Sequence, residues 1–247
     1  MGREYVLGLI ANSKYAELNS NHLKTQSTDH HEMRSTKPTR RVCMVLFDEV
    51  EVLDFCGPFE VFSVTGKRQE LTPFEVCTVS EEGKPITARG GLSINPAYSF
   101  QTCPRSDILL IPGGPGTRRE MNNPKMLHWL RCRAADAELI LSVCSGALVL
   151  GKAGLLNGLK ATTHHGALDE LRSIHRDILV VSHERFVDNG RVIVSAGISA
   201  GIDMSLHVVA RLLGIEQARE TARYMEYEWL SEVTNVERSG NHGRNRR

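Results

Sequence analysis

Cys144 stands in the stretch ILSVCSGALVLG, where an apolar run changes into a helix-like one. Ser142 and Gly146, both small, flank it two positions to either side. This pattern meets the steric requirement of a nucleophile elbow, where a strained residue turns the chain from a strand into a helix. The thiol would lie near a helix N-terminus, so we expect its pKa to be depressed. The alternative is a buried cysteine that begins a core helix; in this context we favour the nucleophile.

A glycine-rich segment, Pro112–Gly116 (PGGPG), directly follows the apolar run DILLI. Glycines at the carboxyl end of a strand let backbone N–H groups face a ligand, as an oxyanion hole requires. The segment does not match the dinucleotide fingerprint G-x-G-x-x-G, and by itself it could be a simple turn. Its presence alongside the predicted elbow favours the oxyanion role.

Asp54, in LDFCGPFEVF, follows the first apolar run and precedes Gly57-Pro58, where we predict that a helix begins. A carboxylate at this position could simply cap the helix. If it faces Cys144 in an apolar pocket, its pKa should rise, and the protonated carboxyl could donate to a thiolate. Glu60 is a weaker candidate because it would lie within the helix.

The elements that must position these residues follow an alternating order. Apolar, β-rich runs alternate with helical stretches, which is typical of an α/β domain with a parallel sheet covered on both faces. Asn189-Gly190 separates two alternating runs and predicts a hairpin. Strands are predicted at residues 42–47, 74–79, 107–112 and 138–143, and helices at 59–64, 124–137, 147–156, 200–214 and 216–229.

Composition excludes several classes of function. The 247 residues include 30 Lys and Arg against 29 Asp and Glu, so the net charge of +1 creates no strong field for nucleic acid or an anionic membrane. The six cysteines are scattered singly, which favours reduced thiols in the cytoplasm over disulfides or a zinc site. We expect no cofactor and no metal site, and no run approaches membrane-spanning length.

The two ends of the chain differ from the rest in composition. Residues 12–40 are rich in Ser, Thr, Asn, His and Lys without sustained periodicity, so we predict a flexible N-terminal extension over residues 1–40. Residues 231–247 have a similar character and predict a flexible C-terminal tail. The folded domain is therefore expected at residues 41–230.

Five motifs together resemble the ThiJ/PfpI superfamily, which is class I glutamine amidotransferase-like. They are, in order, LDFCGPFEVF, IPGGPG, SVCSGALVLGKAGLL, ATTHH (161–165) and GISAGID (197–203). The resemblance is closest to the branch that contains isocyanide hydratase and the amidotransferase-like domains of AraC-type regulators. It implies a flavodoxin-like three-layer sandwich and a homodimer. It also implies Cys144 as nucleophile, Asp54 as its acidic partner, and oxyanion donors from the Gly114 and Ser145 amides, with Gly113 as an auxiliary residue.

A histidine base is the feature of related proteases that this sequence lacks. In several of them the histidine directly follows the cysteine, whereas this chain has Ser145 there. The next candidate is His164, to which we assign at most an auxiliary role, and this argues against peptidase chemistry. Isocyanide hydratase has threonine after its cysteine, so Ser145 keeps the hydroxyl. His165 stands where relatives commonly have an aromatic residue, so the resemblance does not say which side chain forms this wall of the pocket.

A thiol paired with a carboxyl, without a good base, favours a cysteine-dependent hydratase or lyase that acts on a small electrophile. The resemblance implies that this small molecule is an isocyanide, which is converted to an N-substituted formamide. One alternative is a cofactor-free glyoxalase acting on 2-oxoaldehydes, whose relatives usually have Glu in place of Asp54. Another is a ligand- or redox-sensing module in which Cys144 is oxidised to a sulfinate. An AraC-type regulator is disfavoured because too few residues follow Trp229 for DNA-binding helix-turn-helix units. We therefore expect no direct contact with nucleic acid.

Overall fold

The computed structural model describes residues 39–230. The predicted tail at residues 231–247 and nearly all of the predicted extension at residues 1–40 therefore lie outside the described residues. Within residues 39–230, no helix combines the length and the apolar character needed to cross a membrane.

A seven-stranded sheet forms the centre of the domain, in the order β10-β11-β7-β6-β1-β2-β5. Every pairing is parallel except that of β10 with β11. Strands β6 and β7 are buried along their whole length, as apolar parallel strands should be. The strands are β1 (Arg40–Val45), β2 (Phe74–Ser80), β5 (Tyr98–Ser99), β6 (Ile108–Ile111), β7 (Leu139–Val143), β10 (Phe186–Asp188) and β11 (Val192–Ser195).

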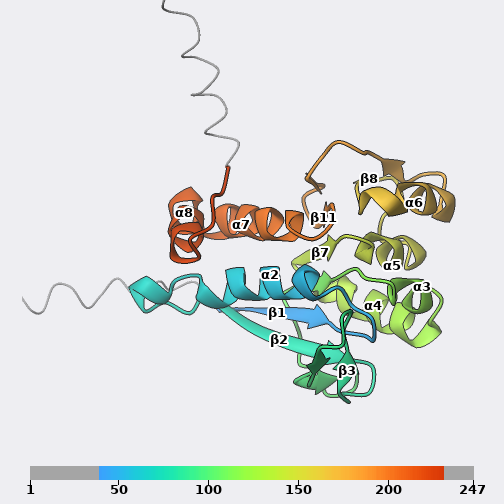
Figure 1. Cartoon of the computed structure of the whole chain (residues 1–247), viewed down its shortest axis with the longest axis horizontal. Coiled ribbons are helices and arrows are strands. Elements are labelled where there is room, and N and C mark those ends of the chain that lie inside the picture. Colours follow the sequence, from blue (N-terminus) through green and yellow to red (C-terminus); the bar gives the residue numbers. More distant parts are fainter. Residues whose placement is uncertain (1–38, 231–247) are drawn as a thin grey trace, which may run out of the picture. The chain divides into compact units, whose positions relative to one another are not determined.

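Helices cover both faces of this sheet (Figure 1). On one face α2 (Val52–Val64), α7 (Ala200–Leu213) and α8 (Ile215–Tyr224) pack against one another. Right-handed crossovers place α4 (Pro124–Asp136) on the opposite face, because β2 lies to one side of β1 while β7 lies to the other side of β6. The predicted α/β architecture, with a mostly parallel sheet and flanking helices, is confirmed.

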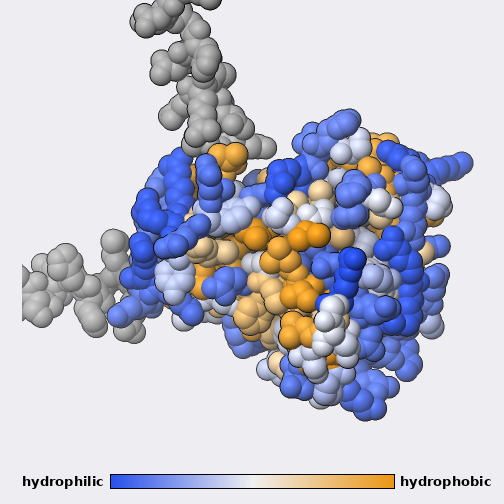
Figure 2. All heavy atoms as spheres, in the orientation of Figure 1, coloured by the Kyte–Doolittle hydropathy of each residue, from blue (hydrophilic) through white to orange (hydrophobic). Residues whose placement is uncertain are grey.

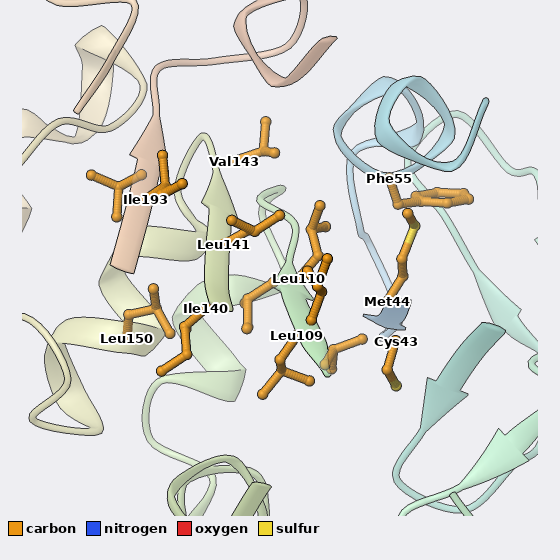
Figure 3. Packing of buried hydrophobic residues seen from close by; sticks show 14 of the residues in the cluster. Cys43, Met44, Phe55, Leu109, Leu110, Ile140, Leu141, Val143, Leu150 and Ile193 are labelled. Carbon is orange, nitrogen blue, oxygen red and sulfur yellow. The ribbon is translucent and has the colours of Figure 1, made fainter. Parts of the chain in front are cut away.

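The core alternates between the two faces along each strand. Figure 3 shows Met44 beside Phe55 of α2, whereas the preceding residue, Cys43, points to the other face. On that other face Leu150, from α5 (Gly146–Lys152), lies beside Ile140 of β7. Two apolar layers therefore sandwich the sheet and fix the positions of its strand ends.

The start of α2 differs from the prediction. The helix begins at Val52, so Gly57 and Pro58 lie inside it rather than at its start. Gly57 serves packing: a Cβ there would lie 2.8 Å from the Cγ1 of Ile202 in α7. The absent side chain thus lets the two helices approach closely. Gly57 is therefore explained by helix packing, and not by the helix start that we predicted from it.

Several short elements had no prediction because two to seven residues are too few to show a period. The hairpin at Asn189-Gly190 is confirmed, and the last predicted helix ends at Tyr224 rather than at residue 229. The unpredicted elements are a small antiparallel pair, β3 (Ile86–Thr87) with β4 (Ser93–Ile94), and a parallel pair, β8 (Lys160–Ala161) with β9 (Leu179–Val180), together with β5, α3 (Thr117–Glu120), α6 (Leu168–Ile174), and the 3₁₀ turns η1 (Lys67–Gln69) and η2 (His165–Ala167).

Candidate active site

The turn between β7 and α5 has the strained geometry of a nucleophile elbow. Cys144 has a φ of 57°, a left-handed value that residues other than glycine rarely adopt. Its N–H lies 3.1 Å from both the Ser195 and the Ala196 carbonyl oxygens, which hold the residue in place. A Cβ at Gly146 would lie 2.2 Å from the carbonyl oxygen of Ile111, so only glycine fits there. The strand-to-helix turn predicted at Cys144 is therefore present.

The elbow lies one strand from the point between β1 and β6 where the strand order reverses. From β1 the chain adds β2 on one side, then continues with β6, β7 and β11 on the other. The loops at the carboxyl ends of the adjacent strands β1, β6 and β7 diverge here, which makes a natural crevice for a ligand. These loops bring together Asp54, Gly113 and Cys144: a Cβ added at Gly113 would lie 2.7 Å from Asp54 Oδ2 and 2.7 Å from Cys144 Cβ.

Asp54 is fully buried in the first turn of α2. Its Oδ2 accepts a hydrogen bond of 3.0 Å from the Gly113 N–H, and its Oδ1 accepts one of 3.1 Å from the Ile198 N–H. The N-cap residue of α2 is Glu51, so the alternative that Asp54 caps the helix is wrong. Glu60, the weaker candidate, is exposed on the same helix.

Burial raises the pKa values of both reactive groups. The pKa of Asp54 rises to about 6, and hydrogen bonds from the Cys144 thiol and the Gly113 N–H limit the shift. Burial and the negative charge of Asp54 raise the pKa of Cys144 to about 12, although the Ser145 N–H acts in the opposite direction. Our expectation of a depressed thiol pKa is therefore wrong. Cys144 is only 7% exposed, and the desolvation of its thiol raises the pKa by more than the Ser145 N–H at the start of α5 lowers it. Near neutral pH the thiol holds the proton and the carboxyl is ionised.

Of the two amides that we expected to form an oxyanion hole, that of Ser145 faces the Cys144 thiol, whereas that of Gly114 is engaged by a side chain, as is that of the auxiliary residue Gly113. The Gly114 N–H donates to Ser145 Oγ over 3.0 Å, and the Gly113 N–H donates to Asp54. Thr117, which the sequence analysis missed, places its Oγ1 2.7 Å from the Gly114 carbonyl oxygen and 3.1 Å from Ser145 Oγ. A substrate oxyanion would use the Gly114 amide only if the Ser145 hydroxyl turned away.

His164 borders the site without bonding to the thiol. Its Nδ1 accepts a hydrogen bond of 3.1 Å from the Gly166 N–H, which leaves the proton on Nε2. Burial, aided by the charge of His165 and Arg118, lowers its pKa, so the ring is neutral near pH 7. Within residues 39–230 no hydrogen bond joins His164 to Cys144. A Cβ at Gly197 would lie 2.5 Å from His164 Cδ2 and 3.6 Å from Cys144 Sγ, so this glycine permits their proximity.

A cleft of about 400 Å³ opens over Cys144, a size suited to a small molecule. Two ion pairs border it: Arg89 with Glu51 at 2.9 Å and Arg118 with Glu170 at 2.6 Å. In the part of the chain that the structure describes, no three His, Cys, Asp or Glu side chains are arranged so that they could hold a metal ion. The cleft is lined by Glu51, Arg89, Gly114, Pro115, Arg118, Cys144, Ser145, His164, Gly166, Ala167 and Ile198.

Comparison with known proteins gives consistent matches. Residues 40–211 match the DJ-1/PfpI family. Isonitrile hydratase from Pseudomonas putida is 34% identical over 187 residues, which cover 76% of this chain and 78% of the hydratase. A crystal structure of a THiJ/PfpI family protein from Pseudomonas syringae superposes with a TM-score of 0.70 at 31% identity, over 83% of this chain and 85% of the other.

Regulators are also among the similar proteins. The HTH-type transcriptional regulator CdhR from Pseudomonas aeruginosa is 30% identical over 168 residues, which cover 64% of this chain but 49% of the regulator. This chain therefore matches about half the length of that regulator.

Proposed function

We propose, from the premise that this chain belongs to the DJ-1/PfpI family, that it is a cysteine-dependent hydratase that adds water to a small isocyanide and releases an N-substituted formamide. The observation that carries the proposal is the buried pair of Asp54 and Cys144, in which the carboxyl pKa is raised to about 6. A carboxyl with this pKa can both accept and return a proton near neutral pH. The similarity to an isonitrile hydratase supports the choice of reaction.

In the first half-reaction Cys144 Sγ attacks the terminal carbon of the isocyanide. Because the free thiol is protonated, its proton passes to the Asp54 carboxylate as the bond forms. Asp54 then delivers this proton to the same carbon, which becomes the CH of a thioimidate. One carboxyl thus serves as base and then as acid, so no histidine is required.

In the second half-reaction water adds to the thioimidate carbon. The ionised Asp54 takes a proton from the water as it attacks and then passes this proton to the substrate nitrogen. The tetrahedral adduct collapses, the C–S bond breaks, and the hydroxyl proton returns to the sulfur. The net change is addition of one water to one isocyanide, with both side chains restored and no cofactor or metal consumed.

The cleft favours a substrate without net charge. Arg89 and Arg118, the two arginines at its border, are each paired with a carboxylate, so neither offers an unbalanced charge. Pro115, Ala167 and Ile198 also line the cleft and add apolar side chains to its wall. An isocyanide with a short organic substituent matches both features.

A substrate panel tests the reaction class. Isocyanides, 2-oxoaldehydes and amides are incubated with the wild type, with Cys144→Ala, and with the matched control Cys132→Ala, which changes an exposed cysteine on α4. We expect turnover of isocyanides alone, retained in Cys132→Ala and lost in Cys144→Ala. Turnover of 2-oxoaldehydes instead would establish the glyoxalase alternative, and binding without turnover would favour a sensor.

We also propose that the chain forms a homodimer through the exposed surface of α2. Leu53 and Phe59 of this helix are 38% and 37% exposed, and Ile198, in the loop before α7, is 39% exposed. Figure 2 shows apolar side chains gathered in the region of α2 on this face of the molecule. A second copy would cover this apolar area without any disulfide.

A further inference from the structure

Three cysteines outside the candidate active site cluster on the α4 side of the sheet. Cys43 on β1 and Cys77 on β2 occupy paired positions in the parallel register, so their side chains share a face. Cys103, in the loop between β5 and β6, lies above them, and its Sγ is 3.5 Å from the Sγ of Cys43. All three are buried. Such a cluster is a candidate redox site because two of the sulfurs already touch.

Cys103 is the one cysteine of the three that lies outside the strand ladder. Cys43 and Cys77 are fixed in the ladder between β1 and β2, whereas Cys103 belongs to a loop. The Sγ atoms of Cys43 and Cys103 must approach by about 1.5 Å to reach the disulfide bond length of about 2.0 Å. A rotation of the Cys103 side chain with a small shift of the loop supplies this movement.

Contacts from α4 hold the loop and polarise its thiol. Arg133 Nη2 donates a hydrogen bond of 2.6 Å to the carbonyl oxygen of Cys103. Trp129 Nε1 donates one of 3.0 Å to the carbonyl oxygen of Phe100. Hydrogen bonds from the neighbouring cysteines, with the charges of Arg133 and Arg41, lower the pKa of Cys103. The pKa of Cys43 is raised because the same hydrogen bond acts in the other direction. Cys103 is therefore the better nucleophile of the two, and Cys43 the thiol that stays protonated.

We propose that Cys43 and Cys103 form a reversible disulfide when the protein meets hydrogen peroxide, at a site separate from Cys144. The Cys103 thiolate attacks one peroxide oxygen, the O–O bond breaks, and with one proton the products are a Cys103 sulfenic acid and water. Cys43 then attacks this sulfur, its thiol proton leaves with the hydroxyl as a second water, and the S–S bond forms. Two electrons pass from the two sulfurs to the peroxide.

Peptide mapping distinguishes the possible pairings, because trypsin places the three cysteines on separate peptides: residues 42–67, 69–89 and 90–105. The folded protein is treated with hydrogen peroxide until exposed Cys132 no longer alkylates, then denatured in acid, alkylated and digested. We expect peptides 42–67 and 90–105 to be joined, at a mass lower by two hydrogen atoms than their sum, and to separate on addition of a dithiol reductant. Free, alkylated Cys43 and Cys103 at this dose would overturn the proposal, as would a bond from either one to Cys77.

Variants assign the bonded sulfur atoms. Cys56 shares a tryptic peptide with Cys43, so Cys56→Ser is the matched control, and the joined peptides should persist in it. They should be lost in Cys43→Ala and in Cys103→Ala; the latter changes a loop residue and preserves the strand core. Persistence of the joined peptides in Cys103→Ala, or their loss in Cys56→Ser, would overturn the assignment.

Discussion

Asp54 and Cys144 are coupled at the scale of single residues. The negative charge of Asp54 raises the pKa of the Cys144 thiol, and the hydrogen bond from that thiol limits the rise in the pKa of Asp54. The carboxyl is fully buried yet has only two N–H donors, from Gly113 and Ile198, so its charge is compensated in part. The thiol next to it is protonated near neutral pH. The nucleophile is thus generated during attack, by proton transfer within the pair.

Alkylation measures this arrangement directly. At pH 7 we expect iodoacetamide to label exposed Cys132 before Cys144, because the pKa of Cys144 is raised to about 12. In Asp54→Asn the negative charge that raises this pKa is removed, so Cys144 should label faster at pH 8 than in the wild type. Peptide mapping at timed intervals gives both rates; equal Cys144 rates in the two proteins would contradict the coupling.

The pH dependence of turnover follows from the same pair. Wild-type activity should fall as the pH drops through about 6, because a protonated Asp54 cannot take the thiol proton. Asp54→Asn keeps the shape of the side chain but cannot cycle a proton, so we expect a loss of about 10²–10⁴-fold at pH 7. Initial rates from pH 5 to 8 test this. Glu60→Gln, an exposed change on the same helix, is the control and should follow the wild-type profile.

The raised pKa of Asp54 also predicts a stability effect. A carboxyl whose pKa is higher in the folded state stabilises the fold at low pH, and this contribution disappears as the pH rises from about 4 to about 6. A shift from 3.8 to about 6 corresponds to about 3 kcal/mol of unfolding free energy. Between about pH 4 and about pH 6, the unfolding free energy of the wild type should therefore fall by about 3 kcal/mol relative to that of Asp54→Asn. Urea unfolding of both proteins at several pH values tests the difference, and a constant difference would exclude it.

At the scale of elements, the loop after β6 is the part most sensitive to added volume. A Cβ at Gly113 would lie 2.6 Å from the Ser145 N and 2.7 Å from Asp54 Oδ2. Gly113→Ala should displace the carboxyl and reduce turnover by at least about 10²-fold, because a misplacement of about 1 Å costs this much.

A second glycine variant separates activity from folding. Gly190, in the β10–β11 turn, has a φ of 84° with no atom within 4 Å of an added Cβ. Gly190→Ala should lower the melting temperature through backbone strain while the activity per folded molecule stays at the wild-type value. A Gly113→Ala protein that is as active as Gly190→Ala would contradict the crowding argument.

The sequence predicted those elements that are long and periodic. Apolar runs and the flanking small residues were sufficient for the elbow at Cys144, because burial and close backbone approach restrict residue type. Ile198 was missed as a donor to Asp54, since its φ of 57° is unusual for a β-branched residue and arises only from tertiary packing. The prediction of a depressed pKa for Cys144 was wrong because the pKa depends on how deeply the thiol is buried. That burial is set by residues far away in the sequence, which spacing along the chain does not reveal.

At the scale of the whole molecule, the apolar surface of α2 predicts self-association. Light scattering at micromolar concentration should give twice the chain mass of 27.5 kDa. Phe59→Glu places a charge on this surface and should give the mass of one chain. Leu179→Glu is the matched control, because Leu179 on β9 is also exposed, at 55%, and lies on a different element. Dissociation by both variants would argue against an interface on α2.

The hydrogen bond between Ile198 and Asp54 joins residues 144 positions apart. During synthesis on the ribosome, Asp54 emerges long before the amide that completes its set of donors, and α7, which packs over α2, emerges later still. A nascent chain that ends before residue 198 holds a carboxyl that is costly to bury and therefore keeps contact with water. We therefore expect this corner of the domain to close late in folding, and the proton exchange between Asp54 and Cys144 to require a chain that extends past residue 198.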